Sequence, residues 1–156
     1  MTNEVRKFSF SAQQVHEILA SDKTIVGEKI EFKPYEKKSL IGKWNVCITE
    51  HPLIRLELHV AAGVPDDPRT YRAALVLEER IRGVDYSDIA IRRYYKEVLP
   101  KGWHQNILDP TLSADDRKQN RHEVLNDFAP VDLKDFLSKV CLLWNIKLPR
   151  REEDLL

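Results

Sequence analysis

The sequence lacks the features that mark several large classes of protein. Its 156 residues include only two cysteines, Cys47 and Cys141, which lie far apart and have no spacing typical of zinc ligands. We therefore expect two buried free thiols in a reducing compartment. No apolar run reaches the ~18 residues that a membrane-spanning helix needs, and the first ten residues contain no apolar stretch of the signal-peptide type. These absences predict a cytoplasmic protein with no membrane partner.

Glycine is scarce, and the net charge is zero. Only five glycines are present, and no phosphate-binding glycine loop, nucleophile elbow or HExxH motif occurs. The sequence therefore predicts no bound cofactor and no bound metal. The 25 basic residues balance 25 acidic ones, whereas a protein whose whole surface binds nucleic acid is usually basic. Any contact with nucleic acid would need a local basic patch.

Helical patterns occur near both ends of the chain. Ser11 and Gln14 form a capping-box pattern that predicts a short early helix. Apolar residues at helical spacing predict a longer helix over residues 132–145. A third helical pattern covers residues 91–98, with Asp88 as its cap and a proline and a glycine just after it.

Between the first and the last helix, the chain reads mainly as strands. Apolar and polar residues alternate there, which is typical of strands buried on one face only. Gly83 predicts a bulge. Strands in the middle and helices at the ends favour a single α+β domain over residues 1–156, with a frayed tail from about residue 150. We expect an antiparallel sheet of four to six strands with the N- and C-terminal helices packed on one face. The expected strands cover residues 24–32, 44–49, 54–60 and 71–81.

The polar segment over residues 103–121 predicts a functional or mobile loop. His104 and His122 flank it, and imidazoles are suited to moving protons near neutral pH. If both act on one substrate, their side chains should lie within about 10 Å of each other, beside a cleft with Arg82 or Arg121 in its wall. A simpler interpretation is a hydrogen-bonded histidine in a loop beside a solvated basic helix.

Several other side chains complete this candidate site. Asp85 is placed to orient a histidine, and Arg82, Arg93 and Arg121 are candidate ligands for a phosphate group. Trp103 is a further candidate for substrate binding. The sequence therefore predicts His104, His122 and Asp85 as catalytic residues.

The order of these short motifs resembles a known family. The stretch RIRGVDY at 80–86 is followed by Gly-Trp-His at 102–104, by Arg-His-Glu at 121–123, by Phe128 and by the last helix. This order resembles the TumE-type small bacterial toxins of toxin–antitoxin pairs, over about residues 71–145. The resemblance implies a sheet that ends in an arginine–glycine–aspartate strand, then histidines in a loop, then a closing helix. It implies no catalytic assignment.

Three functions remain open. The leading one is a small bacterial or phage-borne toxin-like protein that acts on RNA or another phosphate-bearing substrate, without a metal. The alternative is a non-enzymatic protein–protein interaction module that binds an antitoxin or regulatory partner, with Trp103, Tyr94 and Tyr95 as exposed anchors. The third is a metal-dependent nuclease that uses Glu57, Asp85 and one of the two histidines.

Overall fold

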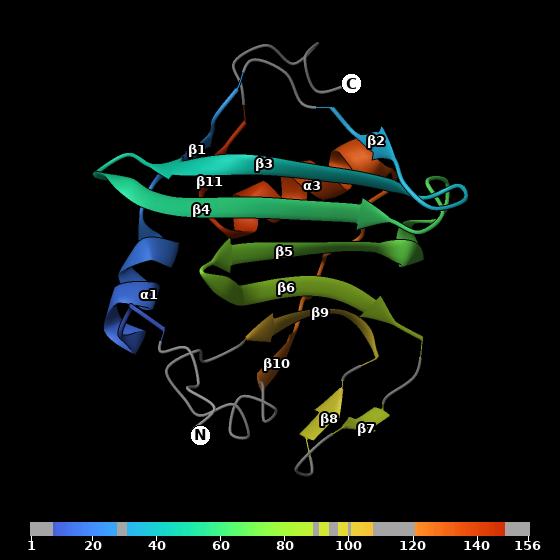
Figure 1. Cartoon of the computed structure of the whole chain (residues 1–156). Coiled ribbons are helices and arrows are strands. Elements are labelled where there is room, and N and C mark those ends of the chain that lie inside the picture. The colour runs from blue at the N-terminus through green and yellow to red at the C-terminus, as the bar shows by residue number, and fades with distance from the viewer. Residues whose placement is uncertain are drawn as a thin grey trace, which may run out of the picture.

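The computed structural model describes residues 8–27, 31–88, 91–93, 97–99, 101–107 and 121–148. Within them a nine-stranded sheet has the order β10-β9-β6-β5-β4-β3-β1-β11, and β2 pairs with β3 beside this path (Figure 1). All neighbours are antiparallel except β1 and β11, which are parallel. The strands of this sheet are β1 (Lys23–Ile25), β2 (Lys33–Pro34), β3 (Leu40–Ile48), β4 (His51–Ala62), β5 (Tyr71–Leu77), β6 (Glu79–Ser87), β9 (Gly102–Ile107), β10 (Arg121–Val124) and β11 (Ile146–Lys147).

The strands predicted over residues 44–49 and 54–60 form within β3 and β4, and the strand predicted over 71–81 forms as β5 but ends at Leu77. The strand predicted over 24–32 forms only as the three residues of β1 within the described part of the chain. From Gly42 in β3, from Leu56 in β4 and throughout β5, every second residue is buried and the residues between are partly or fully exposed. Buried and exposed faces therefore follow the period of two that the sequence shows. A short 3-10 helix, η1 (Pro68–Thr70), leads from the loop after β4 into β5.

The first helix begins at the predicted cap, and the last begins at the start of the range predicted for it, with Asp132 as its N-cap. In α1 (Ala12–Ala20), the Gln14 amide donates to Ser11 Oγ at 3.1 Å, and the Ser11 amide donates to Gln14 Oε1 at 2.8 Å. In α3 (Leu133–Leu143), the Asp135 amide donates to the side chain of the N-cap, Asp132, at 2.7 Å. The face of α3 that contains Phe136 packs on the sheet.

The expected sheet of four to six antiparallel strands is wrong, because the sheet has nine strands and is mixed. Four of the additional strands, β2, β9, β10 and β11, have two to six residues, too few to show a clear alternation in the sequence. The fifth, β6, arises because the strand expected over residues 71–81 turns back at Glu78, which has a positive φ of 60°. Two of the short strands, β9 and β10, occupy the ends of the segment interpreted as a loop. Residues 108–120 lie outside the described part of the chain.

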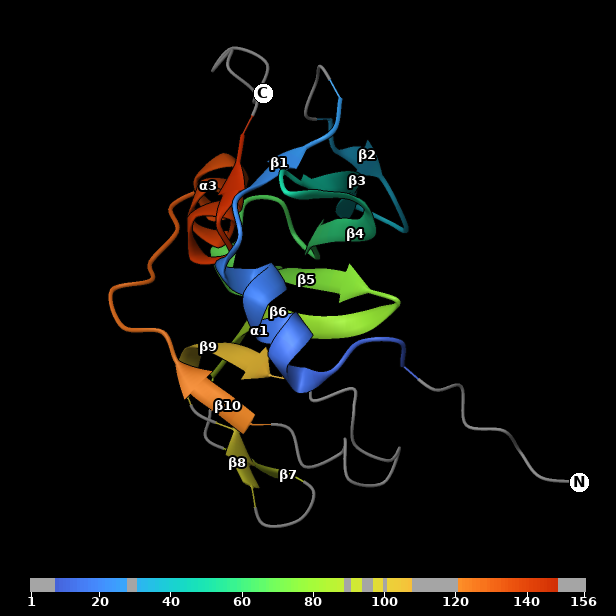
Figure 2. The same cartoon turned by 90° about the vertical axis from the view of Figure 1, so that its left-hand side faces the viewer.

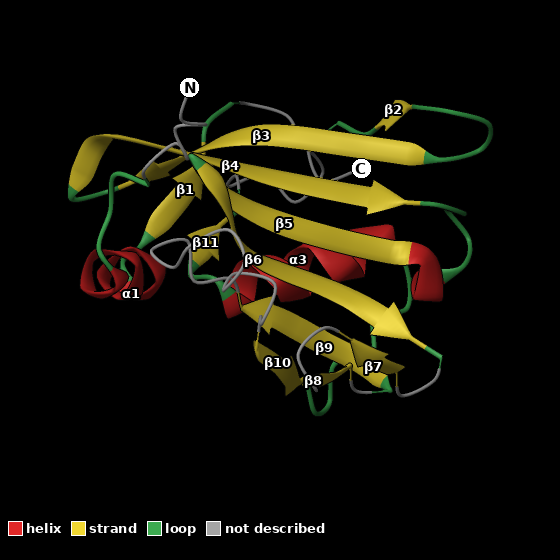
Figure 3. Ribbon diagram, turned by 60° about the horizontal axis from the view of Figure 1, so that its bottom comes forward, coloured by secondary structure: helices red, strands yellow, loops and turns green. Residues whose placement is uncertain are grey.

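The expected position of the helices is also wrong. Only α3 covers a face of the sheet, whereas α1 lies beyond one end of the strands (Figures 2 and 3). The helix expected over residues 91–98 is replaced by the antiparallel strands β7 (Ile91–Arg93) and β8 (Glu97–Leu99), which form a separate two-stranded sheet. Four apolar residues at helical spacing were too weak a pattern to decide between helix and hairpin.

A lysine is buried on the side of the sheet that α3 covers. The Lys23 side chain is fully buried, and its Nζ donates to the carbonyl oxygens of Leu19 at 3.0 Å, Ser21 at 2.7 Å and Trp144 at 2.9 Å. Burial lowers the pKa of Lys23 to about 8, although the charge of Asp22 opposes this. Lys23 therefore links the C-terminal ends of α1 and α3, where free carbonyl groups favour a cation.

Both cysteines are free thiols, as expected. Cys141 is buried in α3, and burial raises its pKa to about 12. Among the described residues, no helix is both long enough and apolar enough to span a membrane.

Candidate functional site

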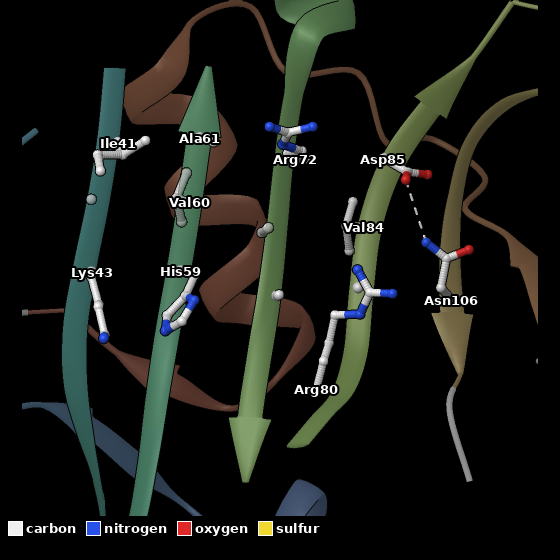
Figure 4. Close-up of a pocket in the computed structure, with 14 residues that line it drawn as sticks. Ile41, Lys43, His59, Val60, Ala61, Arg72, Arg80, Val84, Asp85 and Asn106 are labelled. Carbon is white, nitrogen blue, oxygen red and sulfur yellow. Dashed lines mark hydrogen bonds between the residues drawn. The ribbon is translucent and has the colours of Figure 1, made fainter. Parts of the chain in front are cut away.

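The sheet face opposite α3 carries a cavity of about 320 Å³, which we call the hollow (Figure 4). It extends over β3, β4, β5, β6 and β9, with α3 behind the strands. Its base consists of short side chains at the middle of the face, Ala61, Ala74 and Gly83. Longer side chains on the flanking positions rise around them and leave the centre empty.

Strand register brings these positions together. Directly paired residues form one row across six strands, in the order Lys43, His59, Ala74, Gly83, Asn106 and His122. The row joins residues that are up to 79 positions apart in the sequence, so no local motif could reveal it. The predicted bulge at Gly83 is wrong, because the register shift of β6 lies opposite the Leu75–Val76 step, at Ile81.

The charged side chains that line the hollow are mainly cationic. Lys43, Arg72 and Arg80 line it together with His59. Lys43 Nζ lies 3.4 Å from a Glu57 carboxylate oxygen, and His59 Nε2 lies 3.4 Å from the other oxygen of the same group. The hydrogen bonds and ion pairs within the described residues include none made by the guanidinium of Arg72 or Arg80. Within the described residues, neither arginine forms an ion pair with a carboxylate at the cavity.

Four polar side chains follow one another from His104 to His122 at the β9 and β10 side of the hollow, and we call them the polar chain. His104 Nε2 lies 2.5 Å from Asp85 Oδ1. Asn106 Nδ2 donates to Asp85 Oδ2 at 3.5 Å, and Asn106 Oδ1 lies 2.7 Å from His122 Nδ1. Only Asp85 and Asn106 of this chain line the hollow itself. They connect the hollow to both histidines.

The charge on the polar chain follows from its contacts. Burial raises the pKa of Asp85. The hydrogen bond to His104 and the charge of His104 lower it, and Asn106 and Arg80 lower it further. Together they outweigh burial, so the pKa of Asp85 lies below its ordinary value. Asp85 is therefore a carboxylate at neutral pH. His104 is 1% exposed, and its other nitrogen lies 3.2 Å from the Gly102 carbonyl oxygen.

The two predicted histidines are close together. Their ring centroids lie 5.9 Å apart, with the planes at 84°, so the predicted proximity within about 10 Å is confirmed. The two side chains have different surroundings. His104 is buried and ion-paired, whereas His122 is half-buried and lies next to Asn106. His122 is therefore the histidine better placed to exchange a proton with a ligand.

The other predicted binding residues do not line the hollow. Arg82 pairs across the strands with Leu75, whose side chain is buried on the α3 side, and Arg121 pairs with Ile107 on the same side. Trp103 packs against aromatic rings of the covered face at centroid distances of 5.2 to 5.6 Å. The predicted cleft has Arg72 and Arg80 in its wall instead of Arg82 or Arg121. The side chain of Arg93 lies outside the described residues, as do Tyr94 and Tyr95.

Sequence reasoning missed Lys43, Arg72 and Asn106, and gave Arg80 no role beyond the local excess of basic residues. The outward positions of β4 and β5 read as an ordinary solvated face. The one available signal was the presence of Ala61, Ala74 and Gly83 at positions where a solvated strand usually carries long polar side chains.

No family model, curated protein or solved structure matches this chain. Among the residues that the structure describes, no group of three or more histidine, cysteine, aspartate or glutamate side chains is arranged to hold a metal ion. The geometry of the hollow and the polar chain is therefore the basis for assigning a function.

Proposed function

We propose that the hollow binds a phosphate-bearing ligand, RNA or a smaller phosphate ester. The observation that carries this proposal is the pair Arg72 and Arg80, which line the cavity and make no hydrogen bond or ion pair among the described residues, although the charge of Arg80 acts on Asp85. A guanidinium presents a rigid set of donors that matches the oxygens of a phosphate group. A cavity of about 320 Å³ also falls in the range of small-ligand sites.

Local charge supports an anionic ligand although the whole chain is neutral. Three permanent cations, Lys43, Arg72 and Arg80, border the hollow, and the nearby carboxylates are Asp85 and Glu57. The excess is therefore positive at this face. It is the kind of local patch that a neutral protein needs to bind a phosphate group.

The polar chain supplies a base for chemistry at the phosphate. In this step a ribose 2′-hydroxyl attacks the adjacent phosphorus, the bond from phosphorus to the 5′ oxygen breaks, the hydroxyl proton goes to the base, and the leaving oxygen takes a proton from water. A neutral imidazole carries a proton on one nitrogen and a lone pair on the other. If His122 donates from Nδ1 to Asn106 Oδ1, its Nε2 carries the lone pair that accepts the proton of the hydroxyl group. His104 acts as a positioning residue that holds the Asp85 carboxylate. A metal-independent, toxin-like action on RNA is the form of this chemistry that we propose.

Binding is tested with a fluorescein-labelled single-stranded RNA of six nucleotides, followed by anisotropy at fixed salt. We expect Arg72→Met and Arg80→Met each to weaken binding by about 10- to 100-fold, because each removes charged hydrogen bonds worth about 1.5–3 kcal/mol. Arg82→Met is the matched control, since this arginine pairs with Leu75 on the other face, and it should bind as the wild type does. Equal affinity of all four proteins would overturn the proposal.

Chemistry is tested separately, by separating the products of the same RNA on a gel. We expect His122→Gln to lower the cleavage rate by ~10²-fold or more while anisotropy shows unchanged binding. If His122→Gln cleaves as fast as the wild type, His122 is not the base.

A further inference from the structure

Asn106 lies between a carboxylate and a histidine in the polar chain. Its Nδ2 donates to Asp85 Oδ2 at 3.5 Å (Figure 4), and its Oδ1 lies 2.7 Å from His122 Nδ1. The strand register favours both contacts, because Asn106 pairs directly with His122 on β10 and with Gly83 on β6, two residues before Asp85. One amide group therefore connects a charged side chain of the hollow to the proposed base.

Asp85 fixes the direction in which this amide points. Its Oδ1 lies 2.5 Å from Nε2 of the buried His104, which holds the carboxylate in place. A carboxylate accepts hydrogen bonds and cannot donate them. If the amide were turned over, its oxygen would face a carboxylate oxygen, and two acceptors repel each other. The Asn106 nitrogen therefore faces Asp85, and the Asn106 oxygen faces His122.

The direction of the amide decides in turn which nitrogen of a neutral His122 ring carries the proton. An amide oxygen also accepts hydrogen bonds and cannot donate them, so the contact of 2.7 Å requires a proton on Nδ1. The hydrogen bond made by one ring nitrogen fixes the state of the other. In the neutral ring the lone pair is therefore on Nε2, the nitrogen that accepts the proton in the proposed reaction.

We infer that Asn106 is a positioning residue, which transmits the direction of the Asp85 carboxylate to His122 and holds the neutral His122 ring in the Nδ1–H tautomer. This inference rests on the proposed function of His122 as the base. Without Asn106, the neutral ring divides between its two tautomers, and the ring with its proton on Nε2 cannot accept another there. A carboxylate sets the tautomer of a catalytic histidine directly in some hydrolases, whereas here an amide lies between the two groups.

A second histidine of the hollow provides an internal comparison. His59 Nε2 lies 3.4 Å from Glu57 Oε1. Because this carboxylate partner only accepts, a neutral His59 ring should carry its proton on Nε2. The two histidines should therefore be in opposite tautomers in the same protein, and a change at Asp85 should alter His122 alone.

The tautomers are measured by NMR on 15N-labelled protein, in a spectrum that correlates each ring nitrogen with the carbon-bound protons of its ring. Protonated and unprotonated ring nitrogens resonate in separate regions, and His122→Gln identifies the His122 signals. At a pH where the rings are neutral, we expect the Nδ1–H form of His122 to exceed the Nε2–H form by about 10-fold or more, which is the ratio that one hydrogen bond to a charged group supports. A wild-type spectrum with His122 mainly in the Nε2–H form would overturn the inference without any variant of Asp85 or Asn106.

Asp85→Asn tests the transmission, because an amide at position 85 can present either a donor or an acceptor to Asn106. The preference of His122 for the Nδ1–H form should fall by about 10-fold, and His59 should not change. Asn106→Leu, which removes the amide, should give the same loss. Asp88→Asn is the matched control, because this exposed carboxylate pairs with Arg69 and does not line the hollow. If Asp85 had only a structural role, folded Asp85→Asn protein would keep the wild-type tautomer of His122.

Failure of this inference differs from failure of the proposed function, because the NMR spectrum needs no RNA. If His122 is in the Nε2–H form, or if its tautomer does not respond to Asp85→Asn, the positioning role is overturned and phosphate binding at Arg72 and Arg80 stands. If the tautomers are as expected but His122→Gln cleaves RNA as fast as the wild type, the proposed chemistry is overturned and the assignment of the tautomer stands.

Discussion

The two faces of the sheet are built by the same strands but serve opposite purposes. On the covered face, α3 and the strands enclose apolar and aromatic side chains, among them Tyr71, Leu75 and Phe136. On the open face, the alternate residues of the same strands are short or charged and leave a hollow. Burial of one face supplies the stability of the sheet, so the side chains of the other face are free to be selected for contact with a ligand.

The cations of the two faces show the same contrast. Lys23 is fully buried on the covered side and bonded to three carbonyl oxygens. Arg72 and Arg80 border the open hollow and make no such bonds within the described residues. Lys23 is therefore expected to contribute to folding, and the two arginines to binding. Substitutions on each face test this division, and the largest expected effect comes first.

Phe136→Ala should be the most damaging substitution. Phe136 is 0% exposed and contacts the rings of Tyr71, Trp103 and Phe128. Its truncation should lower the free energy of unfolding by about 3–5 kcal/mol, because a cavity remains in the covered face. Urea unfolding measures this, with Tyr35→Ala at a 59% exposed position as the control. A loss below about 1 kcal/mol would mean that α3 does not close this face.

Lys23→Met should lower the free energy of unfolding by about 1–3 kcal/mol at pH 7, since three buried carbonyl groups lose their donor. The loss should grow at higher pH. The pKa of Lys23 is about 8 in the folded protein and 10.5 when unperturbed. As pH rises from about 8 towards 10.5, the folded state releases a proton that the unfolded state keeps, which stabilises the wild type relative to the variant.

Unfolding curves of both proteins at pH 7, 9 and 10 measure that difference. The other titrating groups are common to the two proteins and cancel in the comparison. A difference in stability that stays constant or shrinks with pH would contradict the assignment of Lys23 as a buried cation.

Asp85→Asn should have a smaller effect on stability, about 1–2 kcal/mol, because His104 loses a charged partner while Asp85 itself is partly exposed. The pKa of Asp85 is lowered in the folded state. Its stabilising contribution is therefore complete above the ordinary carboxyl pKa and is lost as pH falls through the lowered folded value. Acid unfolding followed by circular dichroism should begin at higher pH in the variant, and identical acid transitions would contradict the ion pair.

Gly83→Val should have the smallest effect on folding and a large one on binding. A Cβ at Gly83 would meet its nearest neighbour, Asn106 Nδ2, at 3.4 Å, which is an ordinary contact. Valine also suits a strand better than glycine, so stability should change by less than about 1 kcal/mol. The added methyl groups occupy the base of the hollow and should abolish RNA binding in the anisotropy assay. Unchanged binding would place the ligand elsewhere.

The parts of this molecule that the sequence predicted are those with local causes. The alternation in β3, β4 and β5 and the apolar stripe of α3 are periodic over many residues, so they indicated both the element and its buried face. The cap at Ser11 depends only on a residue three positions away. The conditional expectation that His104 and His122 lie within about 10 Å of each other is met, but the pairing of β9 with β10, which the sequence did not predict, is what brings them together.

Strand pairing decided what the sequence could not. The short strands β9, β10 and β11 have no periodicity of their own and form because longer strands or helices provide a partner. Their register places Asn106 and His122 in one row with Lys43, and it turns Arg82 and Arg121 to the covered side. The sequence by itself determined which residues are polar and which strands have two faces. Only the tertiary structure decided which polar residues surround one hollow, because hydrogen bonds between distant strands set that neighbourhood.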